Sequence, residues 1–423
     1  MNNEQKIRLE NNVLIVPNFP VIPFIEGDGI GAEVWAATQA VVDAAVLHAY
    51  DGQCRIEWME VFAGDKAHQL YGTYLPKETV DTLADYTVAI KGPLATPVGG
   101  GIRSLNVTLR QKLDLYVCMR PVRYFKGAPS PIVDPEKVNM IIFRENTEDT
   151  YAGIEFQAES EELKKLLAML QFDFPETYAK LPFVDAELSI GFKPISRPGS
   201  ERIVRAALEH AITNDLPSVT IVHKGNIMKC TEGSFFKWAI ALAAREYGAT
   251  PVGNGSSYEF DNPVSGATIT IKSVIADAFF EKLLTHPDEH SVVVTTNLNG
   301  DYISDAASGT IGGLGISPGA NINPENGHAI FEATHGTAPD IAGQNKANPC
   351  SLILSAVLML RYIGWIEAAQ AIVDALEHTL ADEVYTSDFY HTVGKGRLVG
   401  TDQFATLLID HINRDEPDWN KGL

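Results

Sequence analysis

Two aspartates stand four positions apart in a polar stretch near residue 300. Asp301 and Asp305 belong to the segment 297–305, and their carboxylates share one face if this segment is helical. Such paired oxygen ligands suit Mg²⁺ or Mn²⁺, with a solvated or helix-capping pair as an equal alternative. A third acid, Asp277, stands within the apolar run 274–279. Because an unpaired buried carboxylate is costly, we expect Asp277 to be paired, metal-bound or functional.

Basic side chains gather between residues 91 and 123 of a strongly acidic chain. The 423 residues carry a formal net charge of −21, yet this segment holds six basic residues and a single acid, Asp114. Glycines at 99–101 and apolar positions interleave them, so we favour an anion site over a solvated basic face. The guanidinium fork of arginine matches a carboxylate with two hydrogen bonds, which suits a di- or tricarboxylate ligand. The basic residues are Lys91, Arg103, Arg110, Lys112, Arg120 and Arg123.

The composition is that of a globular protein of the size of an enzyme. Apolar residues make up 45% and charged residues 21% of the chain, which argues against disorder. The acidic excess argues against nucleic acid and anionic membrane surfaces as partners. The apolar stretch 352–360 is too short to span a bilayer, and the polar N-terminus has no signal-peptide core. Four scattered cysteines favour a reducing compartment, so we expect a cytoplasmic protein.

Short β-branched runs alternate with helical patterns, which predicts an α/β fold. Ligands in such folds bind beyond the carboxyl ends of strands, where several of these runs end in polar clusters. The predicted strands are 21–25, 86–90, 116–119, 140–143, 218–222 and 292–296, and the predicted helices are 203–212, 231–247, 273–284 and 351–362.

The glycines at 27, 29 and 31 satisfy the loose dinucleotide pattern G-x-G-x-x-A. The confirming acid on a second strand is missing, because Asp43 lies in a helical pattern and Asp51 in a polar turn. We therefore interpret these glycines as a tight strand-to-helix turn. Further along, the charged and proline-containing segment 149–194 differs from its surroundings and is predicted to be an inserted subdomain.

Taken together, six ordered motifs resemble the bacterial homodimeric isocitrate dehydrogenases, within the isocitrate/isopropylmalate (β-decarboxylating) dehydrogenase family. The resemblance runs over nearly the whole chain. The motifs are IEGDGIG (25–31), GGGIRSLN (99–106), FREN (143–146), HKGNIMK (223–229), NGDYISD (299–305) and EATHGTAP (332–339).

The resemblance implies an α/β fold of the isocitrate/isopropylmalate dehydrogenase type, which is not a Rossmann fold. Residues 1–115 and 312–423 would form a large domain on the cofactor side. Residues 116–148 and 195–311 would form a small domain with substrate, metal and dimer contacts, and 149–194 a clasp-like insertion. A homodimer with shared active sites is expected.

The resemblance also assigns the site residues. Arg110, Arg120 and Arg144 would clamp the α- and β-carboxylates of isocitrate, and Ser104 and Asn106 would meet the γ-carboxylate. Asp301 and Asp305 of one subunit and Asp277 of the other would bind the divalent metal, with Lys224 and Asn226 also from the partner chain. The implied cofactor contacts are Thr96, Glu332, His335, Gly336, Thr337, Ala338, Asp340, Ile341, Asn348 and Asp388.

The implied reaction is oxidative decarboxylation of isocitrate to 2-oxoglutarate. The metal lowers the pKa of the C2 hydroxyl, Lys224 with Asp277 relays its proton, and hydride passes to the nicotinamide. Tyr151 would then protonate C3 after CO₂ departs.

The chain departs from the NADP-dependent members of the family at the positions directed at the 2′-phosphate. Their Lys-Tyr pair is replaced by Asp340 and Ile341, and their Tyr and Arg nearer the C-terminus by Ser387 and His391. A carboxylate accepts hydrogen bonds from ribose hydroxyls and repels a phosphate dianion. We therefore predict NAD as the cofactor, with Asp340 as a plain surface acid as the alternative interpretation.

Other functions remain open. Within enzymes these are an NADP-preferring isocitrate dehydrogenase and a homoisocitrate or isopropylmalate dehydrogenase. Outside enzymes, a non-catalytic regulatory subunit is conceivable, but such subunits lose parts of the site that this chain keeps.

Overall fold

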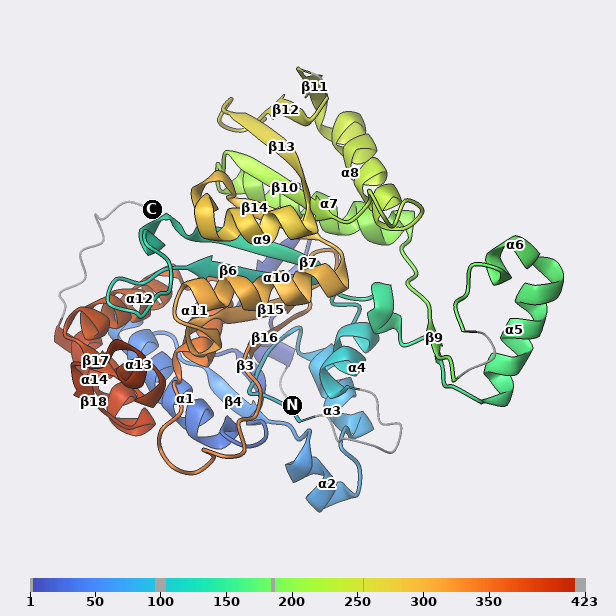
Figure 1. Ribbon diagram of the computed structural model, residues 1–423. Coiled ribbons are helices and arrows are strands. Elements are labelled where there is room, and N and C mark those ends of the chain that lie inside the picture. The colour runs from blue at the N-terminus through green and yellow to red at the C-terminus, as the bar shows by residue number, and fades with distance from the viewer. Residues whose placement is uncertain (1–2, 96–103, 184–186, 254, 415–423) are drawn as a thin grey trace.

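One mixed sheet runs through the molecule. The computed structural model describes residues 3–95, 104–183, 187–253 and 255–414, and twelve strands of these residues form the sheet (Figure 1). In order across the sheet they are β11 (Thr250–Val252), β12 (Ser257–Asp261), β13 (Thr268–Ile275), β10 (Ser218–His223), β14 (Val292–Thr295), β7 (Asn139–Glu145), β6 (Val117–Arg123), β15 (Pro318–Ile322), β16 (Ala329–Ala333), β5 (Val88–Lys91), β3 (Val21–Ile25) and β4 (Glu57–Glu60).

The sheet consists of two parallel blocks joined by antiparallel strands. β13, β10, β14 and β7 pair in parallel, as do β16, β5, β3 and β4. Between the blocks, β6 and β15 pair antiparallel with each other and with their outer neighbours. Every residue of β10, β14 and β5 is buried, which is why these strands read as continuous apolar runs. Thus β6, in the predicted small domain, pairs directly with β15 of the predicted large domain.

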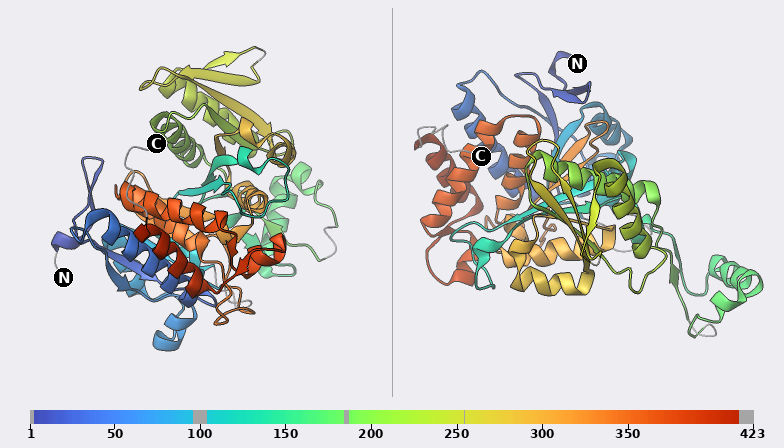
Figure 2. Two further views of the ribbon diagram at one scale, coloured as in Figure 1. Left: turned by 90° about the vertical axis from the view of Figure 1, so that its left-hand side faces the viewer. Right: turned by 90° about the horizontal axis from the view of Figure 1, so that it is seen from above.

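Helices from both ends of the chain cover one half of the sheet. α1 (Gly31–Tyr50) packs against α12 (Ile366–Ala381) and α14 (Thr401–Arg414), and α11 (Cys350–Tyr362) packs on β15 and β16 (Figures 1 and 2). The buried residues Val34, Val41 and Val42 recur at helical spacing on α1. Segments from the two ends therefore share one core.

The other half of the sheet carries the helices that follow its central strands. α7 (Arg197–Thr213) and α8 (Glu232–Tyr247) pack together, and α9 (Ala276–Thr285) contacts α10 (Asn297–Thr310). The remaining helices and strands are η1 (Asn3–Gln5), β1 (Arg8–Glu10), β2 (Val13–Ile15), α2 (Asp65–Tyr71), α3 (Lys77–Asp85), α4 (Leu105–Lys112), η2 (Pro135–Lys137), η3 (Asp149–Ala152), η4 (Pro287–Glu289), η5 (Leu314–Ile316), β17 (Val384–Tyr385), α13 (Ser387–Val393) and β18 (Arg397–Leu398).

The segment predicted as an insertion projects from the body of the molecule (Figure 1; Figure 2, right). It contains β8 (Glu155–Phe156), α5 (Glu161–Asp173), α6 (Pro175–Tyr178) and β9 (Ile190–Gly191), and β8 pairs antiparallel with β9. Its apolar side chains are unusually open, with Phe172 88% and Phe174 55% exposed.

The predicted elements are all present in the structure, although several boundaries differ by a few residues. The predicted strands and the helices at 203–212, 231–247 and 351–362 are confirmed, but the helix expected at 273–284 begins only at Ala276. Ser273 and Ile275 instead continue β13 in register with Ile221 and His223 of β10, so strand pairing overrides the helical pattern. Among the described residues, no helix is both long and apolar enough to cross a membrane.

The glycine turn at 27–31 is confirmed. Gly27 and Gly29 adopt φ values of +94° and +59°, and a Cβ on Gly29 would lie 2.0 Å from the carbonyl oxygen of Thr337. The Ile30 amide donates to that oxygen at 2.9 Å. The glycines thus allow close packing of this turn against the loop after β16.

Candidate active site

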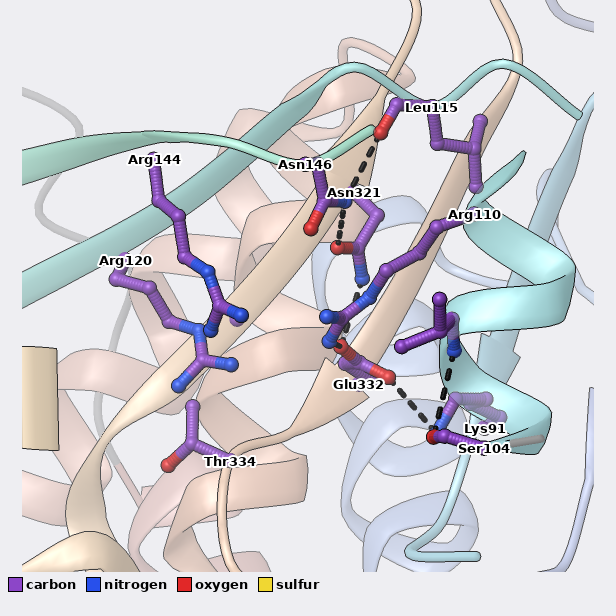
Figure 3. A network of polar contacts seen from close by, with 12 residues as sticks. Lys91, Ser104, Arg110, Leu115, Arg120, Arg144, Asn146, Asn321, Glu332 and Thr334 are labelled. Carbon is purple, nitrogen blue, oxygen red and sulfur yellow. Dashed lines mark hydrogen bonds and ion pairs between the residues drawn. The ribbon is translucent and has the colours of Figure 1, made fainter. Parts of the chain in front are cut away.

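Three arginines from three elements converge beside the centre of the sheet. Arg110 comes from α4, Arg120 from β6 and Arg144 from β7, and their guanidinium groups point into one region (Figure 3). All three are at least 92% buried. The Nε atoms of Arg110 and Arg120 are buried and have no hydrogen-bond partner among the described residues. Unpartnered buried cationic donors of this kind fit a multiply charged anion.

The pairing of the strands brings Lys91 and Arg120 close to Glu332. Lys91 of β5 is paired with Glu332 of β16. Arg120 of β6 and Glu332 of β16 lie on either side of Gly319 in β15. The carboxylate of Glu332 is 2.8 Å from the Lys91 ammonium and 2.5 Å from the Arg110 guanidinium. Burial opposes the charge of Glu332, but Lys91, Arg110 and Arg120 hold its pKa well below the usual value. Burial lowers the pKa of Lys91, partly offset by Glu332.

Two asparagines complete this network: Asn146 belongs to the FREN motif, whereas sequence analysis did not single out Asn321. Asn321 of β15 donates to Glu332 at 2.8 Å, and Asn146 donates to Asn321 at 2.8 Å and to the Leu115 carbonyl at 2.9 Å (Figure 3). A polar residue at position 321 of a fully buried strand was the available signal. Both oxygens of Glu332 are therefore occupied by protein groups on the substrate side, so a cofactor contact of Glu332 stays a prediction.

Arg144 joins the anion site to the acidic helix. Its Nε donates to Asn297 at 2.9 Å, and its Nη1 pairs with Asp301. A Cβ at Gly300 would come within 2.5 Å of the Arg144 side chain, so a glycine is needed where Arg144 passes α10. The Tyr151 hydroxyl donates to the other Asp301 oxygen at 2.7 Å, and its ring lies 4.9 Å from the Arg144 guanidinium.

These contacts set the protonation of the site. Burial opposes the charge of Asp301, but Arg144, Tyr151 and Arg120 outweigh burial and lower the pKa of its carboxyl. Burial raises the pKa of Tyr151 to about 12. At neutral pH the aspartate is therefore ionised and the phenol keeps its proton, as a metal ligand and a proton donor require.

Asp301 and Asp305 both lie on α10, so the condition under which their carboxylates share one face is met. Arg120 approaches Asp305 at 3.8 Å. Among the described residues, no group of three or more His, Cys, Asp or Glu side chains is placed to hold a metal ion. Asp301 and Asp305 supply suitable hard oxygen donors, but a complete ligand set needs a donor from beyond this part of the chain.

Asp277 and Lys224 lie apart from the acidic pair. Asp277, at the start of α9, has a side chain that is 71% exposed, so its expected burial is wrong for the single chain. Its expected pairing is confirmed: the Lys224 ammonium hydrogen-bonds to it, and this bond lowers the pKa of Asp277. Asn226 is exposed in the loop that follows Lys224. These three side chains are open to a second molecule.

The segment 96–106 was predicted to contact substrate and cofactor, and the structure describes it only from Ser104 onward. Thr96, the glycines at 99–101 and Arg103 lie outside the described residues. Ser104 caps α4, with its Oγ 3.5 Å from the Val107 amide, and Asn106 has a buried Oδ1 that lacks a partner among the described residues. This places Ser104 on the same helix as Arg110, as a shared substrate site requires.

The predicted cofactor residues in the described part of the chain include the pair Asn348 and Asp388 and a group in the loop after β16. Asn348 donates to Asp388 at 3.0 Å. The Nε2 atom of His335 is buried without a partner among the described residues, which leaves a polar group for a ligand. The loop that follows β16 carries His335, Gly336, Thr337, Ala338, Asp340 and Ile341.

Fold and site together define an α/β protein with a buried anion site built from three arginines, and the comparisons specify the family. The sequence profile described as isocitrate/isopropylmalate dehydrogenase matches residues 21–408, and the chain belongs to this family. A protein of Staphylococcus epidermidis named isocitrate dehydrogenase [NADP] is 52% identical, with 96% of this chain and 99% of that protein covered. A protein of the same name from Coxiella burnetii is 54% identical, with 96% of this chain and 95% of that protein covered. The crystal structure of isocitrate dehydrogenase from Methylococcus capsulatus matches with a TM-score of 0.76 at 35% identity, and the match covers 93% of this chain and 99% of that chain.

The names of these relatives overturn the prediction of NAD as the cofactor. That prediction rested on Asp340 with Ile341 and on Ser387 with His391, but Asp340 is exposed to water, which weakens its effect on a nearby phosphate. The same turn also carries a cation, because Lys346 donates to Gln344 at 2.9 Å and Gln344 donates to the Asp340 carbonyl at 2.6 Å. In addition, the hydroxyl of Ser387 and the imidazole of His391 can both donate hydrogen bonds to a phosphate.

Proposed function

We propose that this protein is an NADP-dependent isocitrate dehydrogenase that converts isocitrate to 2-oxoglutarate and CO₂. The observation that carries the proposal is the convergence of Arg110, Arg120 and Arg144, with unpartnered buried Nε atoms, beside Asp301 and Asp305. The three arginines would bind two carboxylates, and the hydroxyl of Ser104 and the amide of Asn106 suit a third carboxylate better than an isopropyl group. The names of the relatives support both the substrate and the cofactor.

The chain's own residues divide the chemistry. The arginines bind and orient the substrate carboxylates, with Ser104 and Asn106 placed at the remaining carboxylate. Lys224 and Asp277 together would relay the proton of the C2 hydroxyl away from the substrate. Tyr151 keeps its proton, since burial raises its pKa to about 12, and delivers it to C3 after CO₂ leaves.

A divalent metal and NADP complete the site. Asp301 and Asp305 would hold Mg²⁺ or Mn²⁺, which when bound lowers the pKa of the C2 hydroxyl and stabilises negative charge on the substrate oxygens. The loop 335–341, Asn348, Asp388 and, in a segment outside the described residues, Thr96 would bind NADP. Lys346, Ser387 and His391 would face its 2′-phosphate.

A homodimer would complete each active site. Asp277, Lys224 and Asn226 are open on this chain, and a second copy could bring them to Asp301 and Asp305. The exposed Phe172 and Phe174 of the insertion give a second copy an apolar contact. We propose the two-domain division and the clasp 149–194 on this basis. The cytoplasmic location stays a prediction from the sequence.

The test is a spectrophotometric assay of nicotinamide reduction. With isocitrate and Mg²⁺ or Mn²⁺, we expect rapid reduction of NADP and a much lower kcat/KM for NAD. Isopropylmalate and homoisocitrate serve as controls and should react at least about 100-fold more slowly. A preference for either control acid would refute isocitrate as the substrate. If none of the three acids is turned over, the proposal that the protein is a dehydrogenase of these acids is refuted.

A further inference from the structure

A buried three-charge network lies behind the catalytic lysine. The carboxylates of Asp149 and Glu232 have no exposed surface, and the ammonium of Lys193 lies between them at 2.5 Å and 2.9 Å. Lys193 itself is only 16% exposed at its side chain. Asp149 and Lys193 stand at the two ends of the inserted segment 149–194.

Glu232 connects this network to the Lys224 loop and to α10. One of its oxygens accepts the Lys224 backbone amide at 2.5 Å and the Asn299 side-chain amide at 2.9 Å. Its other oxygen accepts from Lys193 and from the Thr296 hydroxyl. The backbone of Lys224 and the first turn of α10 are therefore attached to the same carboxylate.

Asp149 holds the same helix from the other side. Its Oδ2 accepts the Leu298 amide at 3.0 Å, and its Oδ1 accepts the Thr150 amide at 2.7 Å. The Asp149 amide donates to the Pro194 carbonyl at 2.9 Å, which closes the base of the insertion. Both carboxylates thus contact the first turn of α10, the helix that carries Asp301 and Asp305.

One ammonium compensates two buried carboxylates. Two like charges buried without their shared counter-charge repel and lose solvation, so the pair separates if Lys193 becomes neutral. Asp149 keeps its bonds to Thr150 and Leu298, and the neighbouring Tyr151 ring is held by Arg144 and Asp301. Movement of Glu232, in contrast, releases the Lys224 amide at the start of an exposed loop.

We propose that Lys193 is a positioning residue that fixes the Lys224 loop through the buried carboxylates of Asp149 and Glu232. The inference rests on the proposed function, in which Lys224 and Asp277 relay the C2 hydroxyl proton. The Lys224 ammonium pairs with Asp277, so Lys193 acts on it through the backbone and not by direct contact. Lys193 therefore matters for oxidation of the hydroxy acid and much less for decarboxylation of the β-keto acid that follows.

The test compares Lys193→Met with the wild type and with Lys165→Met, a change at an exposed lysine of α5 in the same insertion. Two reactions are measured: reduction of NADP by isocitrate, and release of CO₂ from the β-keto acid supplied directly. We expect Lys193→Met to lower kcat for isocitrate about 100-fold and CO₂ release by less than about threefold. Lys165→Met should match the wild type in both.

A double variant separates positioning from general loss of structure. In Lys193→Met/Glu232→Gln, the new amide N–H can donate to Asp149 where the ammonium stood, and the amide oxygen can still accept from the Lys224 amide. Kcat for isocitrate should recover at least about tenfold over Lys193→Met. If Lys193→Met does not fold, Lys193→Gln, which keeps one donor, is measured by the same criteria.

Three results would overturn the proposal. These are wild-type rates in the Lys193 variant, an equal loss of both reactions, and a double variant no faster than the single one. The wild type and Lys165→Met test the proposed function separately, because their failure to oxidise isocitrate would refute the function whatever the Lys193 variants do.

Discussion

At the scale of single residues, the buried Nε of Arg120 predicts a large effect of a conservative change. Arg120→Lys keeps the charge but removes the planar fork. We expect KM for isocitrate to rise about 100-fold, equivalent to about 3 kcal/mol, with a smaller change in KM for NADP. Steady-state kinetics of both substrates test this. Arg123→Lys, at the exposed end of the same strand, is the control and should stay within about twofold of the wild type.

Glu332 gives a second prediction at this scale. Glu332→Gln leaves Lys91 and Arg110 buried without their counter-charge, so the free energy of unfolding should fall by about 3 kcal/mol. KM for isocitrate should rise more than KM for NADP, because Glu332 contacts Arg110. Urea denaturation and kinetics check both effects, with Glu325→Gln in the exposed turn before β16 as the control. A larger effect on NADP would instead assign Glu332 to the cofactor.

At the scale of elements, the β3–α1 turn supports the loop of predicted cofactor residues. Gly29→Ala places a Cβ against the Thr337 carbonyl and adds backbone strain, so we expect a loss of about 3 kcal/mol and a raised KM for NADP. Gly72→Ala isolates the strain, since Gly72 also has positive φ but no atom within 4 Å of its Cβ. It should cost about 1 kcal/mol and leave KM unchanged. Equal effects of the two changes would contradict a role for close packing.

The packing of η4 against the central strands predicts a pH dependence of stability. Burial, with a further contribution from Lys272, lowers the pKa of His290 to about 4, below the value near 6.5 of an unfolded chain. Its charged neighbours are Lys272, Lys282, Asp288 and Glu289. The unfolded state therefore binds more protons, and the contribution of His290 is complete above pH 6.5 and is lost towards pH 4, up to about 3 kcal/mol.

Replacing this histidine should flatten that pH dependence. In His290→Gln the amide can still bond to Thr220, whose Oγ1 lies 2.8 Å from His290 Nδ1. Urea denaturation at several pH values between 4 and 7 measures the difference from the wild type. His286→Gln, at an exposed position next to η4, should retain the wild-type dependence. If the free energy of unfolding of His290→Gln depends on pH as in the wild type, His290 is not the source of the pH dependence.

Elements were more predictable from the sequence than contacts between them. The spacing of Asp301 and Asp305 predicts a shared face once the segment is helical, because helical periodicity is local. In contrast, the bond between Arg110 and Glu332 joins residues 222 positions apart, and no local pattern specifies that partner. The apolar run around Asp277 likewise could not distinguish burial within the chain from a face left open for another molecule. The NAD prediction failed for a similar reason, since it considered Asp340 without Lys346.

At the scale of the whole molecule, the described part of one chain does not bring Asp277 together with Asp301 and Asp305 as a group that could hold a metal ion. The proposed dimer would build each site from both chains. A heterodimer of one Lys224→Met chain and one Asp305→Asn chain then has one intact and one doubly damaged site. Isolated through two different affinity tags, it should show about half of the wild-type activity per dimer, although both parent homodimers are inactive.

The reverse arrangement of the same two changes distinguishes shared sites from sites within one chain. A heterodimer of the wild-type chain and a Lys224→Met/Asp305→Asn chain has one damaged residue in each shared site, so it should be inactive. If each chain instead held its own complete site, this second heterodimer would keep half of the activity and the first would have none. Because Lys224 and Asp305 are both partly exposed, at 30% and 51% of their side chains, neither change removes a buried contact on which folding depends.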